Sequence, residues 1–191
     1  MIEKKPFTEI QTDRLILKPH KATIEYATKL YNVIAENKEF LSRFMPLLYK
    51  VSRVEDEYNF CLSASKAFEE MTSADYGIWT KDNQLIGTCT FTDIDYEERS
   101  GEIGYFLSQD QTKKGYMTEA INALMDTFFE RGFNRIVIYM DTQNKPSENV
   151  AIRCGLTKEG QLRQWRFNPV FNEFRNIFVY SKLKSEWKKE K

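Results

Sequence analysis

The chain has 191 residues, of which 41% are hydrophobic and 14% aromatic, and its 28 basic side chains equal its 28 acidic ones. So much apolar material can bury a core, which excludes an intrinsically disordered chain. The balanced charge argues against nucleic acid as the main ligand, because no field over the whole protein draws a polyanion. The length fits one domain, which we expect to span residues 1–191.

The cysteines and the histidine limit the kinds of catalytic and metal site that the chain can form and indicate its cellular compartment. Cys61, Cys89 and Cys154 are far apart in apolar stretches, which predicts reduced, buried thiols in a cytoplasmic protein. His20 is the only histidine, so we expect no zinc site. A histidine-dependent hydrolase would need His20 as its base, and the position of His20 in a predicted loop argues against that role. No apolar run reaches the ~18 residues of a membrane span, and we expect no membrane partner.

The N-terminal third predicts one strand followed by two helices. "DRLILKP" alternates apolar and polar residues, which predicts a short strand that stops at Pro19. A helix is expected from Thr23 and a second from about Val54 to Met71, because apolar residues recur at helical spacing. The predicted buried faces are Ala27, Leu30, Tyr31 and Ile34 in the first helix and Phe60, Ala64, Ala67, Phe68 and Met71 in the second.

The next segment has the period of strands. "DYGIWTKDNQLIGTCTFTDID" predicts two strands around the turn "KDNQ", since Trp, Ile, Thr and Phe favour strands and Asp-Asn favours turns. "SGEIGYFLS" predicts a third strand, which leads through a polar stretch to Gly115.

A regular helix is expected after Gly115. Apolar residues keep i, i+3, i+4, i+7 order until "RGFN" ends the helix at Gly132. The predicted buried face comprises Met117, Ala120, Ile121, Leu124, Met125, Phe128 and Phe129.

The C-terminal part completes a mixed pattern. "RIVIYMD" is a short apolar run, as in a strand buried on both faces, and "NKPSENVAIRCGL" predicts a short helix that Gly155 ends. The tail predicts a hairpin that turns near Asn168 and Pro169. This order of elements favours an α+β or α/β domain with a mixed sheet.

"KKGYMTEA", residues 113–120, joins a strand to a helix. Such a junction can bind an anion, because unpaired backbone N–H groups and the helix dipole point the same way. Lys113 and Lys114 would add charge, and Gly115 would let a phosphate approach the backbone. The alternative is an ordinary helix start with solvated lysines. No G-x-x-x-x-G-K-[ST] motif is present, and no G-x-G-x-x-G follows a strand, which argues against a nucleotide hydrolase or a dinucleotide enzyme.

Residues 101–163 resemble the GNAT superfamily of N-acetyltransferases, specifically its RimJ/RimL-like branch of ribosomal-protein N-terminal acetyltransferases. The matching pieces, in order, are "EIGYFL", "KGYMTEA", "NRIVI" and Asn144-x-x-Ser147 before "CGL". The ends "TDRLILKP" and "VYSKLKSEW" also match, so the resemblance covers nearly the whole chain. It implies an α+β fold in α/β/α layers, with a mixed, mostly antiparallel sheet, splayed central parallel strands and about four flanking helices.

The resemblance implies that acetyl-CoA, as co-substrate, binds between the splayed strands "EIGYFLS" and "RIVIYMD". A pantetheine arm can pair with free backbone groups there, and Phe106 and Leu107 are the implied positions. The family's loop is usually Gln/Arg-x-x-Gly-x-Gly/Ala, and only the central glycine matches strictly, since Thr112 and Met117 stand at its ends. An inactive relative that keeps the fold is the alternative. The pyrophosphate would lie on Lys113, Lys114, Gly115, Tyr116, Met117 and Thr118.

Direct transfer to an amine needs a base for the amine and an acid for the departing thiolate. Glu102 stands where several GNAT enzymes keep a glutamate that acts through water; the alternative is a strand glutamate that faces a cation or solvent. Many GNAT enzymes use a tyrosine as the acid, but Ala151 occupies that position here. The RimL-like branch assigns the role to a serine, which implies Ser147, and the alternative is a helix N-cap.

Two further residues are implied at the cofactor. Asn144 would bond the cofactor arm or hold the strands apart, and the alternative is a plain turn residue. Arg153 would reach the terminal phosphate of CoA, and the alternative is a solvated helix arginine. Cys154 is expected to be a small core residue rather than a covalent acetyl carrier.

The resemblance implies an acceptor site formed by the first two helices, the loop between them and the C-terminal hairpin. "FLSRFMPLL" and "RQWRFNPVFNEF" are expected to line it, and both mix aromatic residues with arginine. We expect an N-acetyltransferase that acts on a protein N-terminal α-amine. The alternatives are acetylation of a small amine, such as an antibiotic or a polyamine, and a non-catalytic acyl-CoA-binding module. A monomer and a homodimer are both compatible with the sequence.

Overall fold

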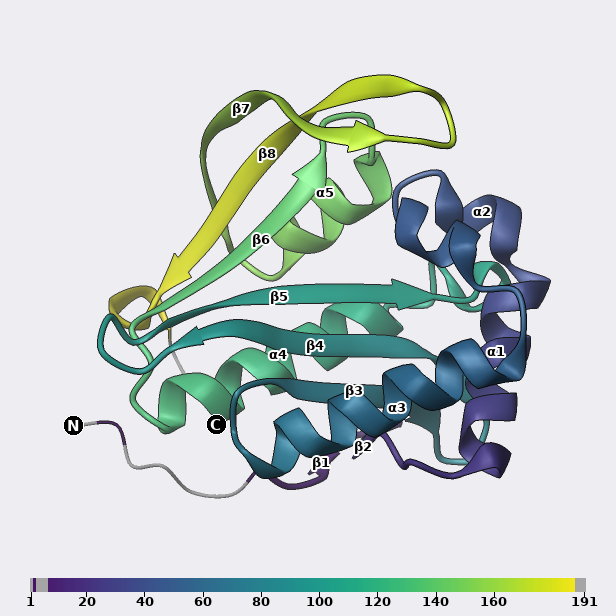
Figure 1. Ribbon diagram of the computed structural model, residues 1–191. Helices are drawn as coiled ribbons and strands as arrows, with labels where there is room; N and C mark the ends of the chain where they lie inside the picture. The colour runs from purple at the N-terminus through teal and green to yellow at the C-terminus, as the bar shows by residue number, and fades with distance from the viewer. Residues whose placement is uncertain (1, 3–6, 188–191) are drawn as a thin grey trace.

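The described residues form a sheet of eight strands, and helices cover both of its faces (Figure 1). The computed structural model describes residue 2 and residues 7–187. The strands run in the order β1-β2-β3-β4-β5-β6-β8-β7, and all neighbours are antiparallel except β5 and β6. The strands are β1 (Ile10–Gln11), β2 (Leu15–Pro19), β3 (Ala74–Thr80), β4 (Leu85–Asp95), β5 (Ser100–Leu107), β6 (Arg135–Asp141), β7 (Thr157–Asn168) and β8 (Glu173–Leu183).

The helices divide between the two faces of the sheet. α1 packs against β4 and α3 against β3, whereas α4 contacts β1, β2, β4 and β5, and α5 contacts β6. The helices are α1 (Ile24–Glu36), α2 (Lys38–Ser42), α3 (Val54–Glu69), α4 (Tyr116–Glu130) and α5 (Lys145–Arg153), with short 3-10 turns η1 (Pro46–Lys50), η2 (Gln109–Gln111) and η3 (Lys184–Glu186). The observed order confirms the predicted α+β architecture, and the described part of the chain has five α-helices where about four were expected.

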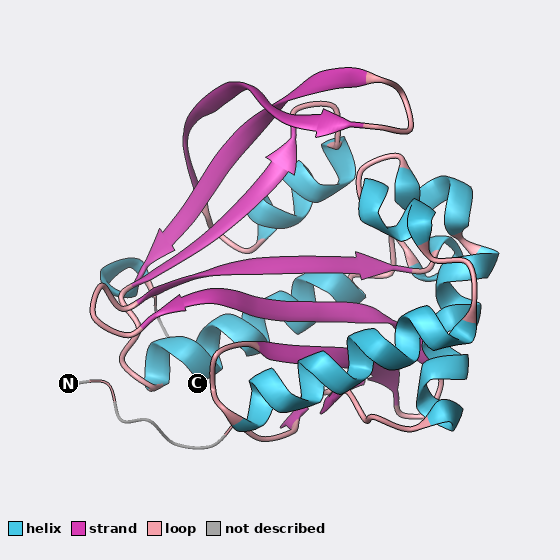
Figure 2. Cartoon of the chain, viewed as in Figure 1, coloured by secondary structure: helices cyan, strands magenta, loops and turns pink. Residues whose placement is uncertain are grey.

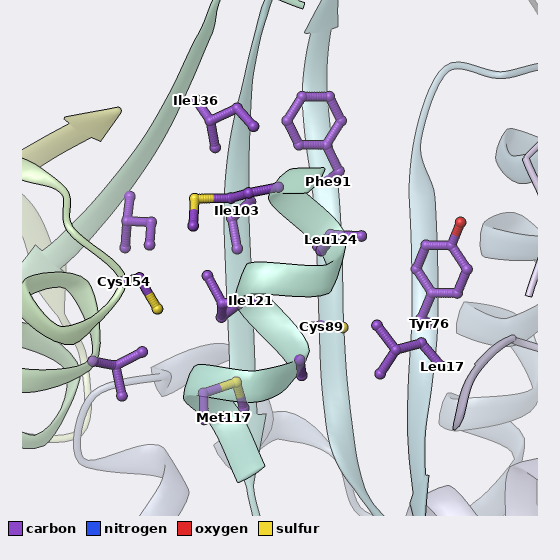
Figure 3. Packing of buried hydrophobic residues seen from close by; sticks show 14 of the residues in the cluster. Leu17, Tyr76, Cys89, Phe91, Ile103, Met117, Ile121, Leu124, Ile136 and Cys154 are labelled. Carbon is purple, nitrogen blue, oxygen red and sulfur yellow. The ribbon is translucent and has the colours of Figure 1, made fainter. Parts of the chain in front are cut away.

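The α4 face of the sheet carries the larger apolar core (Figure 3). All seven residues predicted for the buried face of α4 are buried. They pack against β-strand residues such as Leu17, Phe91 and Ile103, and the rings of Phe91 and Phe128 stack with centroids 3.7 Å apart. Helical spacing alone identified this face because nearly every apolar residue of α4 points to the sheet.

The other face is covered by α1 and α3, and here the predictions are less accurate. Thr23 caps α1 by accepting a hydrogen bond from the backbone of Tyr26, which is buried in place of the predicted Tyr31. In α3, Phe60 is 41% exposed, so its assignment to the buried face is wrong. Phe60 lies at the rim of a cavity and packs edge-on against His20, and the buried polar residue of this helix is Glu57.

The two parallel strands part after a short shared stretch (Figure 2). β5 and β6 pair only over residues 100–102 and 135–137. Beyond that point β5 continues beside β4 to Leu107, and β6 continues beside β8 to Asp141. The splay inferred from the resemblance is confirmed, and it leaves one edge of each strand without a strand neighbour.

Several local predictions are also confirmed. The hairpin of β7 and β8 turns at residues 169–172, as expected, and Cys61, Cys89 and Cys154 are buried free thiols. The short helices α2 and η1 were not predicted, because neither is long enough to show a helical period. Among the described residues, no helix is long and apolar enough to cross a membrane.

Candidate active site

A cavity of about 2160 Å³ lies where β5 and β6 part. It is lined from both faces of the sheet: Thr90, Glu102 and Gly104 are on the side of α1 and α3, whereas Tyr105 and Leu107 are on the side of α4 and α5. The cavity therefore passes through the sheet and can receive one reactant from each face.

The start of α4 forms one end of this cavity. Gly115 is the N-cap residue and has a φ of 83°, and Lys113 before it also has a positive φ of 62°. In the part of the chain that the structure describes, no group accepts a hydrogen bond from the backbone N–H groups of residues 113–118. Consecutive backbone donors without an acceptor at a helix N-terminus are the feature on which the anion site predicted from "KKGYMTEA" depends.

The two lysines of this loop are in different environments. Lys113 lines the cavity, whereas Lys114 donates from Nζ to Oε1 of Gln111 at 2.9 Å. The Lys114 side chain therefore stabilises the loop. It would act on a bound anion only through the long-range field of its charge.

A pair of side chains far apart in sequence holds the loop in place, and sequence reasoning missed it. Arg14 forms an ion pair with Glu119 at 2.7 Å, donates to the carbonyl oxygen of Lys114 and lies over the ring of Tyr116 at 4.7 Å. Burial alone would raise the pKa of Glu119, but hydrogen bonds from Thr12 and Arg14 outweigh it and lower that pKa. The acidic residue in the first turn of α4 was the available signal.

The free edge of β5 supplies backbone groups to the cavity. The Ser108 N–H donates to Ile86 of β4, so alternate residues of β5, including Phe106, also turn their backbone groups to β4. Tyr105 and Leu107 consequently turn theirs to the gap. The prediction for Leu107 agrees with this geometry. For Phe106 it must be corrected: its backbone belongs to the ladder with β4, and its side chain is buried in the core under α1.

α5 brings Asn144 and Ser147 to the same gap. Asn144 is the N-cap residue of α5, and its Oδ1 accepts a hydrogen bond from the Ser147 N–H at 3.2 Å. The helix-cap alternative for Ser147 is therefore wrong, because Asn144 has that role. The Ser147 hydroxyl lies 2.8 Å from the hydroxyl of Tyr105, whose pKa is raised by burial. Tyr105 was missed because its partner lies 42 positions away.

The end of α5 is tied to the start of α4. Arg153 donates from Nε to the Thr118 hydroxyl at 3.1 Å, and both residues line the cavity. Cys154 is 2% exposed, and burial raises the pKa of its thiol to about 12. A protonated, buried thiol is a poor nucleophile, which agrees with the expected core role.

Glu102 lies on β5 at the last residue paired with β6. Its side chain is 21% exposed, and its Oε1 is 3.8 Å from Nη2 of Arg166 on β7. Burial raises the pKa of Glu102, the Arg166 guanidinium acts in the opposite direction, and Asp93 raises it further. The carboxylate of Glu102 therefore lies near a cation, which was the alternative interpretation, and it also lines the cavity.

The two segments that were expected to line an acceptor site both reach this cavity, the second of them only in part. Residues 40–48 and 166–169 both contribute lining side chains. Arg175 of β8 is buried beside them and pairs with Asp141 and Glu173. No group of three or more His, Cys, Asp or Glu side chains suited to a metal ion occurs among the residues described.

Comparison with known proteins identifies the family. Residues 14–157 match the acetyltransferase (GNAT) domain model. An uncharacterised N-acetyltransferase p20 of Bacillus licheniformis is 33% identical over 106 residues, 55% of this chain and 58% of that protein. The ribosomal-protein-serine acetyltransferase of Escherichia coli K12 is 28% identical over 169 residues, 87% of this chain and 92% of that protein.

Solved structures agree with these relatives. The microcin C7 self-immunity acetyltransferase MccE, in complex with acetyl-CoA and AMP, has a TM-score of 0.84 at 28% identity and covers 90% of this chain and 93% of its own. RimL, an α-N-acetyltransferase of ribosomal protein L7/L12 in complex with coenzyme A, has a TM-score of 0.87 at 22% identity, with 94% and 99% covered. The chain therefore belongs to the GNAT family and is an acetyltransferase that uses acetyl-CoA.

Proposed function

We propose that this acetyltransferase acts on the N-terminal α-amine of a protein. The observation that carries the proposal is the cavity through the sheet, with free backbone donors at one end and Glu102 at the other. The names of the ribosomal-protein relatives support a protein acceptor. The three reduced thiols support a cytoplasmic location.

In this proposal, acetyl-CoA is held mainly by the backbone. The N–H groups of residues 113–118 bind the pyrophosphate, with Lys113 adding positive charge. Leu107 pairs with an amide of the pantetheine arm, since its backbone groups face the gap. Asn144 and Arg153 lie along the same wall and are proposed to bond the arm and a phosphate, respectively.

Glu102 is proposed as the general base. An α-amino group has a pKa near 8, so it is mostly protonated at neutral pH and must lose a proton before it attacks. A carboxylate with a raised pKa accepts that proton, directly or through water, more readily than an ordinary glutamate. The amine nitrogen then forms a bond to the acetyl carbonyl carbon, the carbon–sulfur bond breaks, and the thiolate leaves.

Ser147 is proposed to donate its hydroxyl proton toward the departing thiolate. Its neighbour Tyr105 can donate to the Ser147 oxygen at 2.8 Å, so the two hydroxyls form a short chain that ends in the buried phenol. Tyr105 is a positioning residue in this scheme, because it acts through Ser147.

An acceptor screen with free-thiol detection tests the proposed function. Peptides that begin with Ser or Ala are compared with aminoglycosides and with simple amines at equal concentration. We expect acetyl-CoA-dependent thiol release with the peptides, and mass spectrometry that locates the new acetyl group on the α-amine. Turnover with small amines alone would overturn the protein-acceptor assignment. For the oligomeric state, a monomer and a homodimer both stay predictions.

A further inference from the structure

Two neighbouring carboxylates at the start of α3 have opposite environments. Asp56 accepts hydrogen bonds from the backbone and hydroxyl of Ser52 and from Arg53. Glu57 is only 4% exposed and has no hydrogen bond or ion pair with any described residue. Glu57 lines the cavity of the active site. A buried carboxylate without a partner is unfavourable, so a ligand that supplies the partner would be bound.

A second buried carboxylate lines the same cavity. Asp75 on β3 is 8% exposed, and the one donor to its carboxylate among the described residues is the hydroxyl of Ser73. α3 packs against β3, so Glu57 and Asp75 belong to adjoining walls. Burial raises the pKa of Asp75, and burial followed by repulsion from Asp56 raises the pKa of Glu57 to about 7.

Strand register relates this acidic pair to Glu102. Asp75 lies opposite Thr90 of β4, which lies opposite Gly104 of β5, and Thr92 lies opposite Glu102. Directly opposite residues share a face of the sheet, so Asp75 and Glu102 are on the same face, the one covered by α1 and α3. Neighbouring strands are about 4.8 Å apart, and Glu102 lies two residues, about 6.7 Å, along β5 from the position level with Asp75, so the Cα atoms of Asp75 and Glu102 are about 12 Å apart.

No described cationic side chain forms an ion pair with Glu57 or Asp75. The cavity is lined by Lys50, Lys113, Arg153, Arg166 and Arg175. Arg166 is near Glu102, Arg175 pairs with Asp141 and Glu173, and Lys50 is exposed with no carboxylate within ion-pair distance among the described residues. The negative charge at this end of the cavity is therefore available to a ligand.

We propose that Glu57 and Asp75 bind a second ammonium group of the acceptor, about 12 Å from the amine that is acetylated. This inference rests on the proposed acetyl transfer at Glu102 and narrows the acceptor to a molecule with two positive charges. A lysine at the second or third position of a peptide has the required reach, because extended residues span about 3.3 Å each. The far amine of a linear polyamine has it as well.

Thermal shift with paired probes tests the subsite without requiring turnover. 1,8-Diaminooctane and 1-aminooctane have the same chain and differ in the second ammonium group. We expect the diamine to raise the melting temperature of the wild type more than the monoamine, and Glu57→Gln or Asp75→Asn to abolish that difference. Glu55→Gln, an exposed carboxylate on the same helix, is the matched control and should keep it. Equal shifts in the wild type, or a difference that survives in Glu57→Gln, would overturn the inference.

Kinetics with paired peptides identifies the source of the ammonium group. We expect kcat/KM for Ser-Ala-Lys-Ala to exceed that for the norleucine analogue by about tenfold, the ratio typical of one hydrogen-bonded charge. A gain with the diamine probe alone would assign the subsite to polyamines. Diamine binding without acetylation of any amine would reject the proposed function and keep the subsite. Equal turnover of singly and doubly charged acceptors would keep the function and reject the subsite.

Discussion

The two ends of the cavity are built in different ways. At the start of α4, six consecutive backbone N–H groups have no acceptor among the described residues, and a single segment beside the cavity supplies all of them. At the α3 end, side chains from α3, β3, β5 and β7 meet across long sequence separations. A site made of backbone tolerates side-chain changes, which explains how Thr112 and Met117 can depart from the usual loop. A site made of side chains changes with each substitution, so acceptor choice resides there.

The largest expected effect is on catalysis at the side-chain end. Glu102→Gln should lower kcat/KM by about 10²- to 10³-fold, because the general base is lost. The pKa of Glu102 is raised above its ordinary value, so the wild-type rate should fall as the pH drops through that raised pKa, and this acidic limb should vanish in the variant. A pH profile of kcat/KM checks both expectations. Glu98→Gln, an exposed carboxylate of the preceding turn, should change neither.

The next largest effect is expected on acetyl-CoA binding at the backbone end of the cavity. Gly115→Val should weaken acetyl-CoA binding by about a hundredfold, because a β-branched residue is strained at a φ of 83° and its Cβ would lie 3.3 Å from Nη2 of Arg14. Calorimetric titration with acetyl-CoA measures this loss. Gly160→Val is the control, since nothing lies within 4 Å of a Cβ there. If Gly115→Val loses folding stability in proportion to its lost affinity, the loop is only an ordinary helix start.

A smaller effect is expected where the two ends meet. Ser147→Ala should reduce kcat about ten- to a hundredfold and Tyr105→Phe somewhat less, with the KM for acetyl-CoA retained in both. The two hydroxyls act as one unit, so the double variant should be no slower than Ser147→Ala alone. Steady-state kinetics of the three variants decides this. Strictly multiplicative losses would show that Tyr105 does not act through Ser147.

The smallest effect concerns stability. Because Glu57 has a folded-state pKa of about 7, above its ordinary 4.5, its ionisation opposes folding. The stability that its protonated form contributes is fully present below pH 4.5 and is lost as the pH rises through about 7. Glu57→Gln should therefore be more stable than the wild type at pH 8 by about 1–3 kcal/mol, and nearly equal at pH 4. Urea unfolding at both pH values would contradict this if the difference did not change with pH.

The same contrast explains what the sequence could predict. The α4 face was found because its apolar residues have a regular helical period, and the loop before it because one continuous segment joins a strand to Gly115 and the helix. Glu57 was not predicted to be buried, because the helical pattern of apolar residues in α3 assigned Phe60 to the buried face instead. The contacts of Arg14 with Glu119 and of Tyr105 with Ser147 join residues 105 and 42 positions apart, and only the tertiary structure brings them together.

Titration of acetyl-CoA into four proteins tests most directly whether the two ends are separate. We predict that Gly115→Val loses affinity, whereas Glu102→Gln and Glu57→Gln bind acetyl-CoA as tightly as the wild type. A loss of acetyl-CoA affinity in either glutamine variant equal to that of Gly115→Val would contradict the division of the cavity into a backbone-made cofactor end and a side-chain-made acceptor end.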